Sequence, residues 1–467
     1  MKRVFSSFLL GFTLVISVGC SVDNHYDSNS TESLGTVVDV QKIVIEKVNI
    51  DVPTLVIVMN WNNETETGNQ LLWHNKIFDM SEGGASSVNR WYANNTNNNI
   101  TLVPVEETEG TANDGVIMLD MGQNHFNEDN DLNFRNTFVK QALLSPVITS
   151  HVNFANYDKD QNGYISSQEM QIIFIVAGGE LSYGGEIRNS IWAHSWNFDD
   201  DTRPPIVNGI TLLAYSKDKS KLGAYAAFGA EHRESDTKRH KATIGIMTHE
   251  IGHSLYGLLD LYDTSTGGSG LGAYDLMSDG AWGENKNSRY PGEVPTQFST
   301  FSKIGAAQVA SITKVSGESI DLKCSANEFI KLPTAQTNEY FLIECRDTKR
   351  EDSDSAFNYF DPKFPKDKLV AIAYHVDESK RELQDLPNSE NGKQTSTHHY
   401  MVSVLEKDTS SLMTNKSGIT IDYNDVYTEG DMIDNVKMSS YFGEPGFYVE
   451  VRSANYAKRT MNFRVSK

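Results

Sequence analysis

Residues 243–259 read TIGIMTHEIGHSLYGLL and have the spacing of one amphipathic helix. The apolar residues recur every three or four positions, at Ile244, Met247, Ile251, Leu255 and Leu258. Near its end, Gly257 suits the left-handed backbone conformation that commonly follows a helix. We therefore expect a helix here that packs its apolar stripe against the protein core.

The same stretch contains a set of metal-binding side chains. His249 and His253 are four residues apart, so on a helix both imidazoles can face one metal ion. Zinc prefers such nitrogen ligands, and a catalytic zinc site keeps one position for water. Glu250 stands beside the first histidine, where it can take a proton from the zinc-bound water and carry it towards the leaving amine. The pattern predicts a zinc endopeptidase with Glu250 as general base.

Downstream residues favour this interpretation over an inert helix that carries two histidines and an acid by chance. Asp260 and Asp263 follow the helix, and either can supply an oxygen ligand once the chain turns back. The segment 272–277, GAYDLM, places Met277 where a turn can support the metal site from below. We therefore expect the helix to form part of a functional metal centre.

Three tyrosines near this segment are candidates for stabilising the tetrahedral oxyanion. Tyr256, Tyr262 and Tyr274 can each donate a hydrogen bond to it. The sequence does not choose between them, and packing in the core or at the rim is the alternative role for each.

The chain resembles the immune inhibitor A family of secreted bacterial metalloproteases, a branch of the metzincin-like zincins. HEIGH at 249–253 continues to Gly257, Leu261-Tyr262-Asp263 and Asp275-Leu276-Met277-Ser278. Further blocks occur in the family's order: Tyr157-Asp158 to Gly179, Ile191-Trp192-Ala193-His194, Pro295-Thr296-Gln297-Phe298 to Gly305, and 338–344 (NEYFLIE). The resemblance covers residues 53–376 and weakens beyond them.

The resemblance implies an α+β fold. A zincin-type catalytic domain, with a mixed sheet and an active-site helix, would be followed by a β-rich C-terminal domain. It also implies that Met277 occupies the family's methionine turn and packs without binding the metal.

The third zinc ligand requires one adjustment to the family pattern. The family places a glycine three residues after the second histidine and an aspartate three residues later. Here Tyr256 is inserted, so the glycine is Gly257 and the aspartate is Asp260. Asp260 therefore matches the third ligand if the last helical turn is widened by one residue. Asp263 is the alternative.

Residues 158–169, DKDQNGYISSQE, fit a twelve-residue calcium loop at every position. The predicted ligands are Asp158, Asp160, Asn162, Glu169 and the carbonyl of Tyr164. Apolar residues on both sides place the loop between a helix and a buried strand. We expect a structural calcium site that stabilises the catalytic domain, and the alternative is an Asx-rich turn without an ion.

The first twenty residues have the pattern of an export signal. Lys2 and Arg3 precede an apolar run from residue 4 to 18, which ends at Gly19-Cys20. A cysteine at this point resembles a bacterial lipobox, so we expect residues 1–20 to be a signal peptide and Cys20 to carry a lipid. The protein would be a lipoprotein of the cell surface or outer membrane, or be released extracellularly. Secretion without a lipid is the alternative.

Composition along the chain predicts the remaining domains. Residues 21–50 are expected to form a flexible tether. The apolar runs at 55–61 (LVIVMNW) and 171–177 (QIIFIVA) are typical of buried central strands. After residue 315, short apolar runs alternate with polar loops, which favours a β-rich structure. We therefore predict a catalytic domain at 51–315 and a β-rich domain at 316–467.

Two cysteines remain once Cys20 is set aside. Cys324 and Cys345 each lie in or beside a strand-like run. An even pair in an exported chain can oxidise, so a disulfide between them is predicted, and two separate buried thiols are the alternative.

The net charge limits the possible binding partners. The net charge of −21 argues against nucleic acid as the main partner, because phosphate backbones require basic patches. We expect a monomer that acts on protein or peptide substrates.

The other histidines are expected to have ordinary structural roles. His194 stands between tryptophans and should be buried and hydrogen-bonded. Four others occur in polar stretches and should be solvated: His232, His240, His398 and His399.

A different class of function must also be considered. The chain could be a calcium-stabilised surface binding protein on an inactive protease fold. The intact Glu250 favours the enzyme, because an inactive site has no chemical need for that carboxylate.

Overall fold

The computed structural model describes residues 36–467, apart from 82–86, 97–99, 127–133, 185–187, 236, 263–268, 365, 383–398, 409–420 and 444–445. The predicted signal peptide and Cys20 lie outside the described residues. Within the described part of the chain, no helix combines the length and the apolarity needed to cross a lipid bilayer.

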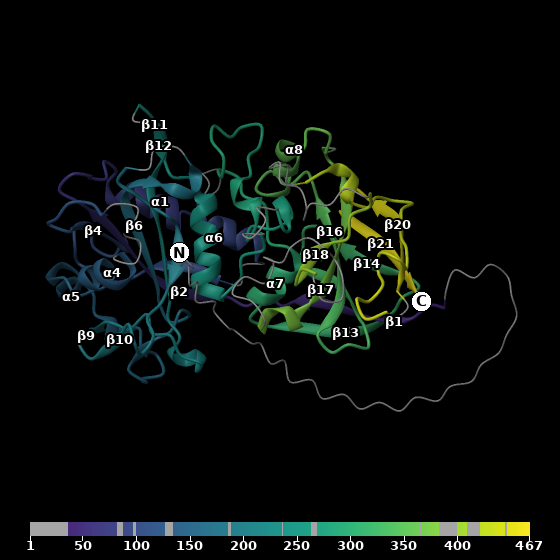
Figure 1. The fold of residues 1–467 in the computed structure, drawn as a ribbon, viewed down its shortest axis with the longest axis horizontal. Coiled ribbons are helices and arrows are strands. Elements are labelled where there is room, and N and C mark those ends of the chain that lie inside the picture. Colours follow the sequence, from purple (N-terminus) through teal and green to yellow (C-terminus); the bar gives the residue numbers. More distant parts are fainter. Residues whose placement is uncertain are drawn as a thin grey trace, which may run out of the picture.

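The N-terminal half is built on a mixed sheet with the strand order β12-β11-β6-β2-β3 (Figure 1). The strands of its parallel part are β2 (Ile50–Asn60), β3 (Ile100–Pro104), β4 (Val116–Asp120), β6 (Gln171–Glu180), β7 (Ser190–Ile191) and β11 (Tyr225–Ser235). Two strands run antiparallel to β11: β8 (His194–Trp196) and β12 (Lys238–Lys241). The expected buried strands at 55–61 and 171–177 form the centre of this sheet.

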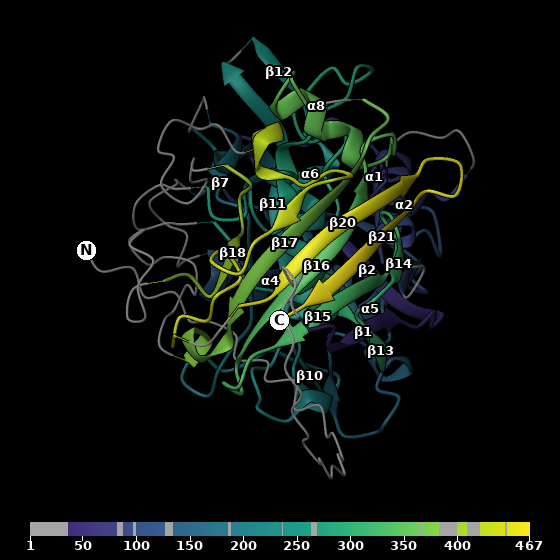
Figure 2. The same cartoon turned by 90° about the vertical axis from the view of Figure 1, so that its right-hand side faces the viewer.

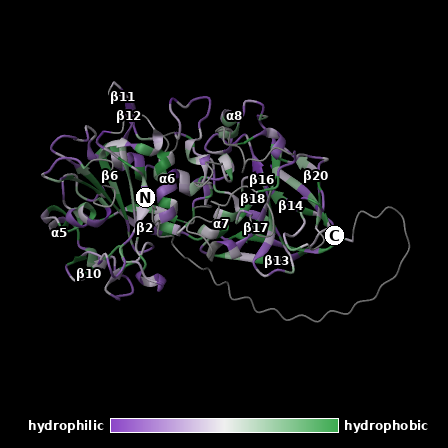
Figure 3. Cartoon of the chain, in the orientation of Figure 1, coloured by the Kyte–Doolittle hydropathy of each residue, from purple (hydrophilic) through white to green (hydrophobic). Residues whose placement is uncertain are grey.

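Both faces of the sheet are covered, which explains why its central strands are apolar at successive positions. Val56, Val58 and Ile173 point into the core that includes helix α6 (Ile244–Tyr256). Leu55 and Ile172 point into a second core on the opposite face. Hydrophobic residues accordingly gather on the interior strands, whereas hydrophilic residues occupy the loops (Figure 3).

Short helices surround the sheet. The further α-helices are α1 (Gln70–Phe78), α2 (Val88–Asn95), α4 (Val139–Leu143), α5 (Pro146–His151), α7 (Thr300–Ala306) and α8 (Phe357–Phe360). A π-helical turn, η2 (Phe134–Phe138), leads directly into α4. A small separate sheet has the order β5-β10-β9, formed by β5 (Tyr164–Ile165), β10 (Ile210–Leu212) and β9 (Ile206–Val207).

The C-terminal half is a β-sandwich, and the mixed α+β character predicted from the sequence is confirmed. One antiparallel sheet has the order β13-β1-β15-β16-β17-β18, and a second has the order β14-β21-β20-β19. Figure 2 shows β20 and β21 lying in front of β16 and β17. The bounds are β13 (Ala310–Ser316), β14 (Ile320–Lys323), β15 (Glu328–Pro333), β16 (Glu339–Asp347), β17 (Leu369–Asp377), β18 (Val402–Val404), β19 (Met432–Ile433), β20 (Tyr448–Asn455) and β21 (Thr460–Ser466).

The first described strand corrects the predicted tether at 21–50. Strand β1 (Asp39–Ile45) lies between β13 and β15 in the sandwich, with Asp39 paired to Ser316. Val40 and Ile45 are buried there, so this segment is part of the folded C-terminal half. The described part of residues 21–50 is therefore not a free linker.

The predicted boundary at 315/316 does not separate two independent cores. It falls at the end of β13, which already belongs to the sandwich. Strand β16 contributes Leu342 to the core around α6 and Phe341 to the core of the sandwich. The two halves therefore pack as one continuous body around β16 and β17. The structure joins Cys324 and Cys345 in a disulfide, with Cα atoms 4.4 Å apart.

Candidate active site

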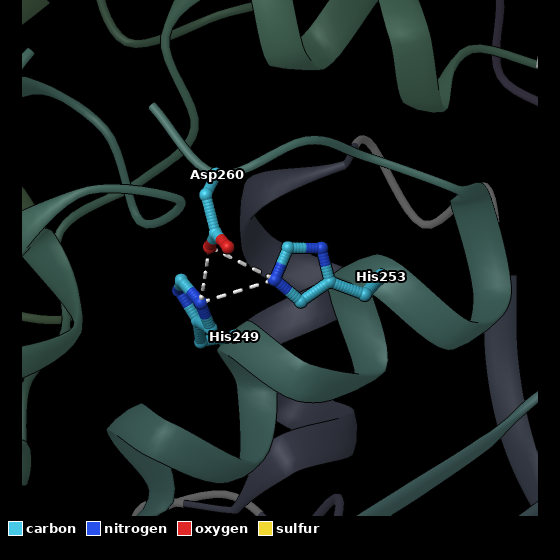
Figure 4. Close-up of side chains that lie close together, drawn as sticks. All are labelled: His249, His253 and Asp260. Carbon is cyan, nitrogen blue, oxygen red and sulfur yellow. Dashed lines mark hydrogen bonds and ion pairs between the residues drawn. The ribbon is translucent and has the colours of Figure 1, made fainter. Parts of the chain in front are cut away.

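The site is formed by helix α6 and the segment that follows it. His249 and His253 lie one turn apart on α6, and Asp260 returns towards them from the following loop (Figure 4). The structure thus brings together both predicted histidines and the predicted aspartate. Asp263 lies outside the described residues.

The three metal-facing atoms form a nearly regular triangle. Asp260 Oδ1 lies 3.1 Å from Nε2 of His249 and 3.1 Å from Nε2 of His253, and the two nitrogens are 3.2 Å apart. Tetrahedral zinc with ligands at about 2.0–2.1 Å would place ligand atoms about 3.3 Å from one another. The separations therefore fit three ligands of one tetrahedral zinc ion.

The hydrogen bond made by Nδ1 of each histidine determines which way the lone pair of its Nε2 points. His249 Nδ1 donates to the carbonyl of Leu276 at 3.0 Å, and His253 Nδ1 donates to that of Leu258 at 2.6 Å. A carbonyl only accepts, so in the neutral rings Nδ1 carries the hydrogen and Nε2 the lone pair. Two nitrogen lone pairs and a carboxylate oxygen that meet at one point suit a bound cation, and such outer contacts orient metal-binding histidines.

The end of α6 explains how Asp260 reaches the histidines despite the inserted Tyr256. Gly257 adopts φ 67°, ψ 30°, in the left-handed region expected after a helix. The N–H of Leu258 donates to Gly252 O at 3.3 Å. This closure spans one residue more than the usual six-residue Schellman turn. The Gly257 N–H also donates to His253 O at 2.8 Å, as in an ordinary α-helical turn, so the extra residue is accommodated where the chain leaves the helix at Gly257 and Leu258.

Met277 lies directly beneath the metal-binding helix. A Cβ atom added at Gly252 would come within 2.7 Å of Met277 Sδ, so the sulfur occupies the space that a side chain would take. Asp275 fixes this turn, because it accepts hydrogen bonds from the N–H of Met277 at 2.8 Å and from Ser302 Oγ at 2.6 Å. The carbonyl that orients His249 belongs to Leu276 in the same turn. The turn therefore supports the site through packing and through one histidine.

Glu250 is buried on α6 beside the first histidine. Burial raises the pKa of Glu250 to about 8, while the neighbouring His249 acts in the opposite direction. The negative charge of Glu180 raises the pKa further, and the positive charge of Arg135 lowers it. A metal dication at the triangle would favour the ionised carboxylate of Glu250 in the same way as these positive charges.

The pKa values of Asp260 and the two histidines influence one another. Burial on its own would raise the pKa of Asp260. The nearby His253 and His249 nevertheless hold this pKa far below its ordinary value. The pKa of His253 is raised by Asp260, against the effect of burial. Asp260 is therefore present as an anion, which is the form that binds a metal.

The structure distinguishes the three candidate tyrosines. Tyr262 lies at the site, with its ring centroid 6.4 Å from that of His249. Tyr256 is buried on α6 with its ring centroid 5.9 Å from that of Tyr92. Tyr274 donates to the carbonyl of Asp422 at 3.1 Å in the C-terminal half. Only Tyr262 among these three is placed near the metal-facing atoms.

The expectations for the remaining histidines are partly wrong. His194 is buried and bonded to Tyr225 Oη at 3.1 Å, as expected. His232, in contrast, is fully buried with its ring 4.2 Å from that of Tyr183, and burial lowers its pKa to about 2. His399 is buried against Asp377 Oδ2 at 2.6 Å. His240 is half-buried. His398 lies outside the described residues.

The predicted calcium loop has its acidic side chains drawn together. Oxygens of Asp158, Asp160 and Glu169 lie within 4.8 Å of one another. Asn162 faces the same loop, because its Oδ1 accepts from the N–H of Tyr164 at 2.8 Å. Backbone N–H groups also approach the carboxylates, with Lys159 N at 2.9 Å from Glu169 Oε1. The predicted residues are thus gathered at one place between η3 (Phe154–Asn156) and β6.

This loop lies close to helix α6 although the two are far apart in the sequence. A cleft of about 430 Å³ is lined by residues of both segments, among them His253 and Glu169. Ser254 donates to Gln171 Oε1 at 2.9 Å, and Gln171 Nε2 donates to the carbonyl of Ser167 within the loop at 2.6 Å. The loop therefore supports the C-terminal end of α6. These contacts join segments that are distant in the sequence, so no local sequence motif predicts them.

The comparisons with known proteins agree with this geometry. A search of curated proteins found no match. Residues 59–307 match the family model described as "Immune inhibitor A peptidase M6, catalytic domain". The matched region contains α6, Asp260 and Met277. The chain therefore belongs to the immune inhibitor A peptidase M6 family, a family of metallopeptidases.

Proposed function

We propose that this protein is an exported, zinc-dependent endopeptidase that uses Glu250 as general base. The observation that carries the proposal is the convergence of His249, His253 and Asp260, whose facing atoms lie 3.1–3.2 Å apart. Hydrogen bonds from both Nδ1 atoms to carbonyls leave both Nε2 lone pairs aimed at that point. Zinc is the metal that this nitrogen-rich donor set and its separations suit best. Loss of protein cleavage when zinc is removed is the direct test.

In this mechanism His249, His253 and Asp260 would hold the ion, and Glu250 moves the proton. A bound zinc ion would polarise the scissile carbonyl and increase the acidity of the attacking water. The Glu250 carboxylate accepts the proton of that water and later donates it to the leaving amine nitrogen. Tyr262, whose ring centroid lies 6.4 Å from that of His249, is our candidate for donating a hydrogen bond to the tetrahedral oxyanion.

The assignment of Asp260 as the third zinc ligand can be tested by comparing the zinc affinities of two aspartate variants. Asp260→Ala is expected to weaken zinc binding by more than about a hundredfold, because losing a ligand should exceed the tenfold to hundredfold effect of losing a partner of a ligand. Asp263→Ala is the matched control and should change zinc affinity much less. Competition with a chromogenic chelator measures both constants. The reverse order would show that Asp260 is not the ligand.

We also propose that the 158–169 loop binds calcium for stability. Its carboxylates repel one another without a cation, and an ion that binds only the folded loop stabilises the protein by mass action. At a hundredfold excess over the dissociation constant, this linkage contributes about 2.7 kcal/mol to the free energy of unfolding.

Asp158→Ala combined with Glu169→Ala is therefore expected to lower the melting temperature in calcium and to remove the calcium dependence caused by this loop. Scanning calorimetry at several calcium concentrations measures the effect. Asp201→Ala, at an exposed position outside the loop, is the control and should behave like the parent. If the double variant melts like the parent at every calcium concentration, the loop is a turn without an ion.

For location, we propose that the signal peptide and the lipid on Cys20 predicted from the sequence hold the enzyme at the cell surface or outer membrane. The disulfide between Cys324 and Cys345 supports this proposal, because such bonds persist in oxidising, extracytoplasmic compartments.

A further inference from the structure

A second acidic group lies in the C-terminal half and shares no residue with either predicted metal site. Glu406 and Asp408 follow strand β18, and Asp425 ends the 3-10 turn η11 (Tyr423–Asp425). One carboxylate oxygen from each of these three residues lies within 4.8 Å of the others. The chain therefore brings together three carboxylates from two separate loops.

Asp425 provides an independent sign of a ligand. Its side chain is 1% exposed, and its Oδ2 accepts from the N–H of Asp422 at 2.6 Å and from Tyr274 Oη at 3.2 Å. Its second oxygen, Oδ1, is buried and has no hydrogen-bond partner among the described residues. A buried polar atom without a partner destabilises the fold unless something binds it. The capping interaction with Asp422 accounts for one oxygen of Asp425 and leaves the other for a ligand.

Two lysines near this group also have contacts outside the three carboxylates. Lys407 stands between Glu406 and Asp408 in the sequence, but its Nζ pairs with Asp431 at 2.7 Å. Lys437 donates to the main-chain carbonyl oxygens of Glu406 and Lys407. A cation between the three carboxylates would offset the repulsion of their negative charges.

The donor set indicates the class of cation. All three groups are carboxylates, and hard cations such as calcium bind oxygen ligands at about 2.3–2.6 Å. Two ligands on opposite sides of a calcium ion are then about 4.8 Å apart, a span that contains all three oxygens. The triangle at α6 differs because it holds two imidazole nitrogens at shorter separations, which zinc prefers.

We propose that Glu406, Asp408 and Asp425 form a second site for a calcium-like cation, separate from the 158–169 loop. Through Asp425 the site contacts Tyr274, three residues before Met277 in the turn under α6. A bound ion therefore fastens the loops of the C-terminal half to the turn that supports the active site. This inference does not depend on the proposed peptidase mechanism.

The experiment measures calcium binding by isothermal titration calorimetry. The parent protein is expected to bind two calcium ions, and the Asp158→Ala/Glu169→Ala variant one. Adding Glu406→Gln and Asp408→Asn to that variant should abolish the remaining binding, and Glu406→Gln alone should weaken it about tenfold or more. Glu429→Gln, at an exposed neighbouring position, is the control and should leave the binding unchanged.

Folding is checked separately from binding. Glu406 and Asp408 are partly exposed and the amides match them in shape, so calcium-free circular dichroism should be the same for all variants. In the parent protein, Glu406→Gln with Asp408→Asn should reduce the stoichiometry from two to one. Binding that is unchanged by these amide substitutions, or a loop variant that binds no calcium while still folded, would overturn the proposal.

Discussion

Replacing Glu250 by glutamine is expected to reduce kcat/KM for casein or a peptide substrate by about 10²–10⁴-fold. The amide has nearly the shape of the carboxylate but cannot accept the proton of the attacking water. Glu250 lies beside the ligands without being one of them, so the zinc content should remain that of the parent. This combination of full metal content and lost turnover distinguishes a base from a ligand.

The matched control for this change is Glu234→Gln. Glu234 is an exposed glutamate on β11, and its substitution should leave the cleavage rate unchanged. Cleavage by Glu250→Gln at the parent rate would show that the base has been assigned wrongly. Absence of cleavage in the zinc-loaded parent would instead favour a surface binding protein on an inactive peptidase fold.

His253→Ala is expected to remove both the zinc and the activity. The substitution deletes one of the two nitrogen ligands and leaves the carbonyl of Leu258 without its donor. The remaining His249 and Asp260 cannot complete a three-ligand site. Elemental analysis after dialysis should fall from about one zinc per chain to near zero, and cleavage should fall to background.

A surface histidine provides the comparison for this variant. His151 bonds to Thr108 at 2.8 Å on an exposed part of the chain, far from the helix α6 in sequence. His151→Ala should retain the parent zinc content and activity. If His253→Ala keeps its full zinc content, the ion is bound elsewhere and the ligand assignment fails.

The local sequence pattern was sufficient to predict the helices and strands that depend on the spacing of neighbouring residues. The stripe on α6 and the apolar runs of β2 and β6 follow from helical periodicity and from burial on both sheet faces. The pair His249 and His253 is positioned by helical spacing alone. Asp260 required more, because its approach depends on how the chain leaves α6 at Gly257. The inserted Tyr256 was the one sign of this in the sequence.

Features that depend on distant partners were missed for a physical reason. Strand β1 contains polar residues and becomes a strand through pairing with β13 and β15, more than two hundred residues away. His232 and His399 occur in polar sequence but are covered by Tyr183 and Asp377 from other elements. The acidic group at 406–425 has no motif spacing, because its members meet only after the loops fold. Burial by remote segments cannot be derived from a single window of sequence.

The central claim, zinc-dependent peptide hydrolysis at α6, is tested most directly by following zinc content and casein cleavage in one sample. The protein is assayed as purified, after zinc removal with 1,10-phenanthroline and dialysis, and after stoichiometric zinc is restored. We expect about one zinc per chain, parallel loss of metal and cleavage, and recovery of both. Cleavage that continues at the original rate after the zinc has been removed would contradict the account.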